Sequence, residues 1–104
     1  MFARSIHMKL KPKSALTFSR LYNRQVLPVL REQPGFKDGM TLISGERAEA
    51  IVLSFWDRRS SADAFAKSAY AGLIADLDGV LASPPQVSTM VLSNSTKHQL
   101  ATRG

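Results

Sequence analysis

Residues 2–10 alternate between two kinds of side chain, which predicts a β-strand with one buried face. One side of this strand combines apolar residues with a single arginine: Phe2, Arg4, Ile6, Met8 and Leu10. The other side carries Ala3, Ser5, His7 and Lys9. Pro12 ends the strand, because proline cannot donate a hydrogen bond to a β ladder.

Residues 14–32 have the periodicity of a helix. At 100° per residue, one narrow sector collects the apolar residues Ala15, Phe18, Tyr22, Val26 and Val29. The opposite side collects Arg20, Arg24 and Arg31, so we expect a surface helix with a cationic outer face. Pro28 removes one backbone hydrogen bond and predicts a kink in the last turn. Three leucines outside the sector predict a second contact surface: Leu16, Leu21 and Leu27.

The remaining elements follow from the same two periods. Residues 36–44 and 48–56 predict two strands joined by a turn at Gly45-Glu46. Residues 61–81 predict a helix, with Ser60 as its N-cap and Asp63 as a capping-box acid. Residues 86–93 predict a fourth strand.

The element order β-α-β-β-α-β predicts an α+β fold of the ferredoxin-like kind. We expect a four-stranded antiparallel sheet with two helices on one face, in one domain spanning residues 1–95, followed by a polar tail over residues 96–104. The face without helices needs a cover if it is apolar, and we assign five residues to it: Val52, Trp56, Val87, Thr89 and Val91. Two copies packed through this face would form a C2 homodimer.

Composition excludes several classes of site. The 104 residues contain no cysteine, so disulfides, thiolate metal sites and cysteine nucleophiles are ruled out. No apolar run approaches the roughly 20 residues of a membrane helix, and charges interrupt the first ten residues, so we expect a cytoplasmic protein without a membrane partner. Residues 1–31 hold seven of the 14 basic residues and none of the eight acidic ones. These basic residues lack interleaved aromatics, so we do not expect a nucleic-acid partner.

Few residues remain that could carry chemistry. His7 and His98 are far apart and no carboxylates cluster, so we expect no metal site. His7 could act as a general base, or it could be an ordinary half-buried histidine. Trp56 could form the flat wall of an aromatic pocket, or it could anchor the core. Tyr22 and Tyr70 could place phenol groups in a polar cavity, or they could simply pack in the core.

Five short segments, in the same order, resemble the antibiotic biosynthesis monooxygenase domain of the dimeric α/β-barrel superfamily. They are Val-Leu-Pro-Val-Leu-Arg at 26–31, Gln-Pro-Gly-Phe at 33–36, Ser-Phe-Trp-Asp at 54–57, Ala-Asp-Ala-Phe at 62–65 and Pro84-Pro85. The resemblance covers residues 2–95, and its most specific parts are Pro34-Gly35-Phe36 and Trp56-Asp57.

The resemblance implies a homodimer with a pocket between sheet and helices in each copy. Some members oxidise polycyclic phenols or quinols with O₂ and without any cofactor, because an electron-rich phenolate can itself reduce O₂. Trp56 occupies the place of a pocket tryptophan in such oxygenases, whereas Val52 stands where some of them carry an asparagine. Haem-degrading relatives have a histidine ligand where this chain has Ala75, so haem is not expected.

We therefore expect a cofactor-independent monooxygenase-like protein that binds a small aromatic or quinone-type molecule. The expected catalytic residues are His7, Trp56 and Tyr70, and the expected substrate-binding residues are Tyr22, Val52 and Phe65. The alternative is a dimeric module without catalytic activity that binds a small molecule or another protein.

Overall fold

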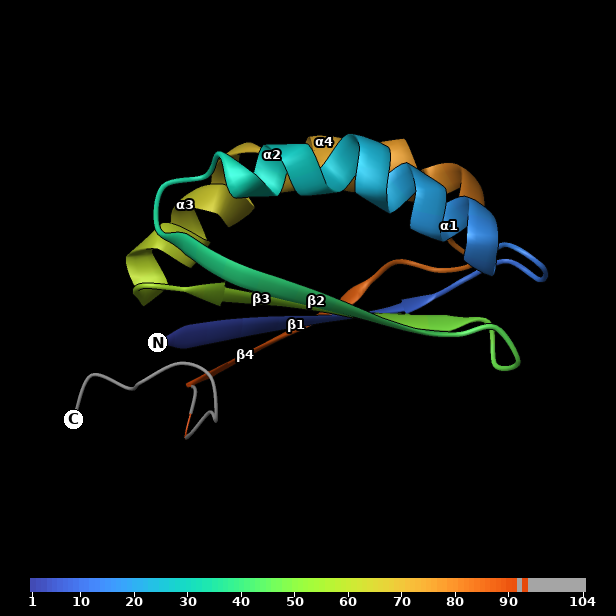
Figure 1. The fold of residues 1–104 in the computed structure, drawn as a ribbon, viewed down its shortest axis with the longest axis horizontal. Helices are drawn as coiled ribbons and strands as arrows, with labels where there is room; N and C mark the ends of the chain where they lie inside the picture. Colours follow the sequence, from blue (N-terminus) through green and yellow to red (C-terminus); the bar gives the residue numbers. More distant parts are fainter. Residues whose placement is uncertain (92, 94–104) are drawn as a thin grey trace.

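The structure, a computed structural model, describes residues 1–91 and 93. Four antiparallel strands form one sheet in the order β2-β3-β1-β4, and the helices all lie on one of its faces (Figure 1). The strands are β1 (Phe2–Lys9), β2 (Phe36–Ser44), β3 (Glu49–Trp56) and β4 (Gln86–Val91). The predicted ferredoxin-like α+β fold is confirmed. The tail predicted for residues 96–104, with His98, lies outside the described residues.

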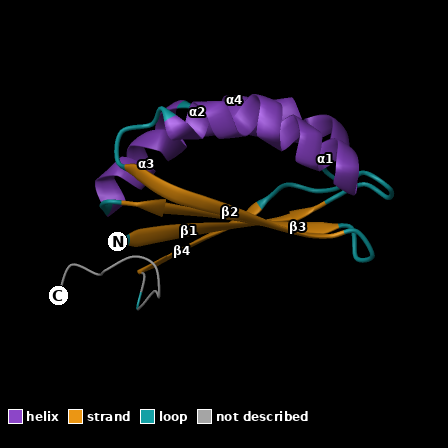
Figure 2. Ribbon diagram, viewed as in Figure 1, coloured by secondary structure: helices purple, strands orange, loops and turns teal. Residues whose placement is uncertain are grey.

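Each of the two helical connections consists of consecutive pieces (Figure 2). The first connection comprises α1 (Ala15–Leu21), the π-helical turn η1 (Tyr22–Val26) and α2 (Leu27–Arg31). The second comprises α3 (Arg59–Ser68), α4 (Tyr70–Leu77) and the 3₁₀ turn η2 (Asp78–Val80). Both connections cross the same face of the sheet, which leaves the opposite face without helical cover.

The π-helical turn decides which residues of the first connection reach the core. Phe18, Tyr22, Val26 and Leu30 are all buried at a constant spacing of four residues. In a regular α-helix this spacing drifts by about 40° at each step, whereas the wider π turn holds the four residues in line. Leu30 is therefore buried where the sequence predicts Val29 to be buried, and that prediction was wrong. The π turn ends two residues before Pro28, where the sequence predicts a kink.

The buried face of the sheet differs from the prediction in one respect. Val52 pairs with Ile6 and Trp56 pairs with Phe2, so both lie on the helix-covered face, where they are 3% and 0% exposed. Their assignment to the uncovered face was wrong. The same assignment was wrong for Val87, Thr89 and Val91, because they pair with Ile6, Arg4 and Phe2 and so lie on the same side of the sheet as those residues. On β3 that face instead presents the alternate residues Ile51, Leu53 and Phe55. Residues 50–56 are apolar on both sides apart from one serine, so alternation alone does not show which side is covered.

Two predicted details of the helices are also wrong. Helix α3 begins at Arg59 after Arg58, with no side-chain cap, so Ser60 is not its N-cap and Asp63 is not a capping-box acid. Leu21 and Leu27 pack against the core, so the second contact surface predicted for three leucines reduces to Leu16, which is 62% exposed.

Candidate functional site

An apolar cavity of about 30 Å³ lies between the sheet and the two helical connections. That volume holds one or two water molecules, whereas pockets for small organic ligands measure roughly 300–1,000 Å³. A ring-shaped ligand can therefore enter only if wall side chains move aside. The wall combines sheet residues with residues of η1, α2, α3 and α4: Ile6, Met8, Tyr22, Val26, Leu30, Val52, Ser54, Phe65, Tyr70, Leu73, Ile74 and Leu77.

Two tyrosines and a serine are the wall residues whose side chains carry a polar atom: Tyr22, Tyr70 and Ser54. Burial raises the pKa of Tyr22, and a hydrogen bond with the Thr41 side chain partly offsets the rise. Burial also raises the pKa of Tyr70, against the opposing influence of the Arg4 charge. Both phenols therefore stay protonated at neutral pH, able to donate and to accept a hydrogen bond. The wall residues include no histidine, aspartate or glutamate, so none of them is a base at neutral pH.

The three expected substrate-binding residues, Tyr22, Val52 and Phe65, and the expected catalytic residue Tyr70 are brought together in this wall. Trp56 is not part of it. Its indole is fully buried, stacks on the Phe65 ring at 5.3 Å between centroids and meets the edge of the Phe36 ring at 5.5 Å. Its Nε1 donates a hydrogen bond to Ser54 Oγ at 3.0 Å. Trp56 thus supports two wall residues from behind, and direct ligand contact by Trp56 stays a prediction.

His7 lies on the other face of the sheet, away from the cavity. Its Nε2 is 3.3 Å from Glu49 Oε2, and Lys9 Nζ is 4.0 Å from Glu49 Oε1. The His7 side chain is 37% exposed. The role of His7 as a general base stays a prediction, and within one protomer it would require a ligand on the face without helices.

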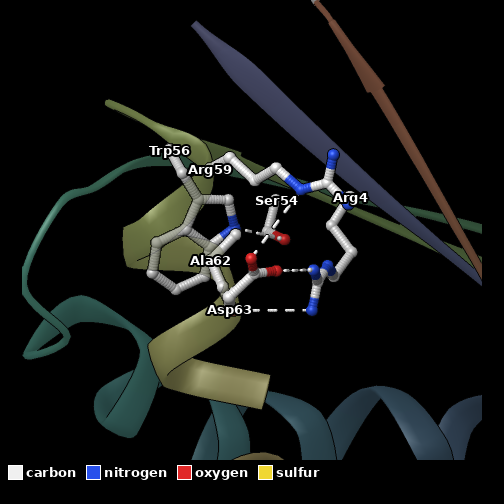
Figure 3. A network of polar contacts seen from close by, with 6 residues as sticks. All are labelled: Arg4, Ser54, Trp56, Arg59, Ala62 and Asp63. Carbon is white, nitrogen blue, oxygen red and sulfur yellow. Dashed lines mark hydrogen bonds and ion pairs between the residues drawn. The ribbon is translucent and has the colours of Figure 1, made fainter. Parts of the chain in front are cut away.

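The sequence predicts no functional role for Arg4, yet Arg4 is a charged residue buried on the helix-covered face, only 8% exposed (Figure 3). Its Nη2 donates to Asp63 Oδ1 at 3.1 Å, and its Nη1 donates to the Ala62 carbonyl at 3.4 Å. Its Nε is buried and has no hydrogen-bond partner. The signal was present in the sequence, because Arg4 shares one side of an amphipathic strand with four apolar residues.

Metal-binding clusters and membrane-spanning helices are both absent from the described part of the chain. Among residues 1–91 and 93, no three histidine, aspartate or glutamate side chains are grouped so that they could hold a metal ion. No helix in these residues combines the length and the apolar character needed to cross a membrane.

No protein-family model matches the chain, and no curated protein matches it. Solved structures do match it. A monooxygenase of Streptomyces coelicolor in complex with the ligand nanaomycin D is 19% identical, with a TM-score of 0.76 over 90% of this chain and 88% of that one. A cofactor-independent oxygenase of Streptomyces nogalater is 11% identical, with a TM-score of 0.72 over 93% of this chain and 97% of that one.

A protein of unknown function from Nitrosomonas europaea is similar to the same degree. It is 19% identical, with a TM-score of 0.76 over 91% of both chains. Structures described as antibiotic biosynthesis monooxygenases match about 90% of this chain as well. At such low identity these likenesses show the fold, so the chain has the fold of the antibiotic biosynthesis monooxygenases, a fold shared by oxygenases and by proteins without a known activity.

Proposed function

We propose that the chain binds a small hydroxylated aromatic or quinone-type molecule in the cavity between sheet and helices and oxidises it with O₂, without a metal or flavin. The observation that carries the proposal is the make-up of the cavity wall, whose residues are apolar except for Ser54, Tyr22 and Tyr70. Sites for flat organic ligands combine such a wall with a few polar groups that fix orientation. The fold shared with a cofactor-independent oxygenase supports the same reading.

For this reaction the protein needs mainly to bind the substrate and to stabilise the negative charge that forms on it. In the balanced reaction of an anthrone-type substrate, the ring methylene carbon gains one oxygen atom of O₂ and loses two hydrogens, which leave with the other oxygen atom as water. The substrate supplies all the electrons, and it reduces O₂ most readily as a phenolate. The wall residues Val52 and Phe65 would contact the ring, and the tyrosine hydroxyls would hydrogen-bond to its oxygen atoms.

A second candidate function is ligand binding without turnover. The small volume of the cavity, about 30 Å³, favours it, because a catalytic pocket must admit substrate and O₂ together. Val52 favours it as well, since an apolar side chain there offers no hydrogen bond to a reacting oxygen atom. In this case the protein would carry or sense an aromatic molecule.

We also propose that a second copy of the chain covers the face of the sheet without helices. Four exposed apolar residues lie on that face: Met40 at 49%, Leu42 at 57%, Ile51 at 37% and Met90 at 50%. Apolar surface gathered on one face of a sheet marks an association site, and a twofold axis lets the same face cover itself.

Turnover and binding can be tested separately. Oxygen uptake is measured with hydroquinones and anthrones under aerobic and anaerobic conditions, and binding is followed by the fluorescence of Trp56, the single tryptophan, whose ring stacks on Phe65. Tyr70→Phe removes one hydroxyl from the wall, and Leu16→Ala on the exposed helix surface is the matched control. We expect uptake that needs O₂ and falls at least about tenfold in Tyr70→Phe.

Each other outcome has a defined meaning. Binding without oxygen uptake supports the second candidate and removes the catalytic one. Absence of binding across the panel overturns both. Uptake that Tyr70→Phe and Leu16→Ala leave equally unchanged would place the reaction outside this cavity.

A further inference from the structure

We propose that Arg4 is the anion-binding group of this site, and that the ligand is held as an aromatic oxyanion, a phenolate whose oxygen accepts a hydrogen bond from the Arg4 guanidinium. This inference rests on the proposed function, because it requires that an aromatic ring enters the cavity. It adds the charge state of the ligand and the residue that selects it.

The first observation is that the hydrogen-bonding capacity of Arg4 is incompletely used. A guanidinium has five N–H donors. Only the bond to Asp63 has a normal length, 3.1 Å, whereas the bond to the Ala62 carbonyl is long at 3.4 Å and Nε has no partner. An unsatisfied buried donor destabilises the folded protein, so such a donor on a residue that pairs with the wall residue Ser54 points to a partner that arrives from outside.

The second observation is that the counter-charge of Arg4 is shared. Asp63 accepts from Arg4 through Oδ1, while its Oδ2 lies 3.7 Å from Arg59 Nε (Figure 3). The Asp63 side chain is 44% exposed, so water also weakens its attraction for Arg4. The three side chains together carry one net positive charge, and the Arg4 end of the group is the buried one.

The third observation is the location of Arg4 beside the cavity. Arg4 pairs in register with Ser54 on β3, and Ser54 lines the cavity. Ile6, two residues further along the same face of β1, lines it too. No wall residue carries a charge, and Arg4, which is not itself part of the wall, is the charged residue next to Ser54 on this face of the sheet. Tyr70, another wall residue, already experiences the Arg4 charge.

These observations indicate how Arg4 would affect the ionisation of a bound ligand. A cation in a poorly hydrated site favours the ionised form of a neighbouring acid. Arg4 would therefore lower the pKa of a bound phenol, whose proton leaves to water. The wall contains no base to remove that proton, so electrostatic stabilisation of the phenolate takes the place of a general base in producing the electron-rich form of the ligand.

The test uses two probes that differ in a single ionisable oxygen, para-nitrophenol and its methyl ether para-nitroanisole. Binding is followed by quenching of Trp56 fluorescence, and ionisation of para-nitrophenol by its visible phenolate absorbance. Arg4→Met removes the charge at similar volume, and Arg4→Lys restores it. Arg59→Met is the matched control, because Arg59 also contacts Asp63 but its side chain is 72% exposed.

We expect wild-type protein to bind para-nitrophenol at least about tenfold more tightly than para-nitroanisole and to lower its pKa. Arg4→Met should abolish both effects and leave para-nitroanisole binding unchanged. Arg4→Lys should recover part of them, and Arg59→Met should keep them.

Equal affinity for the two probes in the wild type overturns the inference and leaves the proposed cavity site standing. This comparison needs no variant, so it decides the matter even if Arg4→Met does not fold. Binding of neither probe overturns the proposed function together with the inference. A preference for para-nitrophenol that survives in folded Arg4→Met assigns the anion to another residue and also overturns the inference.

Discussion

The two faces of β3 are both apolar over residues 50–56, apart from Ser54, but only one of them lies in the core. On the helix-covered face, Met8, Ala50 and Val52 are at most 3% exposed. On the other face, Leu42 and Ile51 are 57% and 37% exposed, although Ile51 lies in the central strand β3 and Leu42 lies in β2 beside it. The comparison shows that the two sides of β3 are similarly apolar, and that the helices covering one side make the difference in burial.

The two faces also differ in how deeply their charged side chains are buried. Arg4 and Asp63 pair on the covered face, where the Arg4 side chain is 10% exposed, and His7 and Glu49 pair on the other, where their side chains are 37% and 24% exposed. Water can solvate a partly exposed pair, so such a pair contributes little to stability. A buried charge depends on its partners, and Arg4 has too few of them. The covered face, and not the face that carries His7, is therefore the more informative about function.

The largest effect is expected from removing the central aromatic of the covered face. Trp56→Ala should lower the free energy of unfolding by about 3–5 kcal/mol, because it leaves a cavity under Phe65 and Phe36. Urea unfolding followed by far-ultraviolet circular dichroism measures the change. Leu16→Ala, on the exposed helix surface, should change it by less than about 0.5 kcal/mol. A loss below about 1 kcal/mol in Trp56→Ala would contradict the placement of the core.

The next effect tests whether the other face is covered by a second copy. The double substitution Leu42→Lys with Ile51→Lys places two charges on register partners of β2 and β3. It should raise the dissociation constant of a homodimer at least about 100-fold, since each charge would be buried twice in a twofold interface. Sedimentation velocity at micromolar concentration reports the change. Leu16→Lys is the control, and a wild-type protein that sediments as a monomer would refute the dimer.

The smallest effect is on alkaline stability. Burial raises the pKa of Tyr22 and Tyr70, so the folded state holds these protons more tightly than the unfolded chain. Their contribution is complete below the ordinary tyrosine pKa of about 10 and decreases as the pH rises above it. Replacing both by phenylalanine should make the urea midpoint less sensitive to pH in that range. An unchanged dependence would show that neither phenol is desolvated in solution.

Much of the fold could be predicted from the sequence because it follows from local periods. Alternation predicted strands at 2–10, 36–44, 48–56 and 86–93, each of these ranges contains one strand of the structure, and the 3.6-residue period located both helical segments. Four of the predicted site residues meet in one cavity wall, since aromatic and apolar residues on a buried stripe reach the core in most packings. The π turn was not predictable in this way, because it changes the helical period itself.

The sequence by itself determined the order of the elements, the membership of each face and the apolar character of the interior. Only the tertiary structure decided which face of β3 the helices cover, and with it that Trp56 and Val52 are buried. The reason is that a period of two defines two faces without ranking them, and a one-residue slip in register would exchange them. Arg4 is buried for the same reason, because the helices that cover this face of the sheet exclude the water that would otherwise solvate its charge.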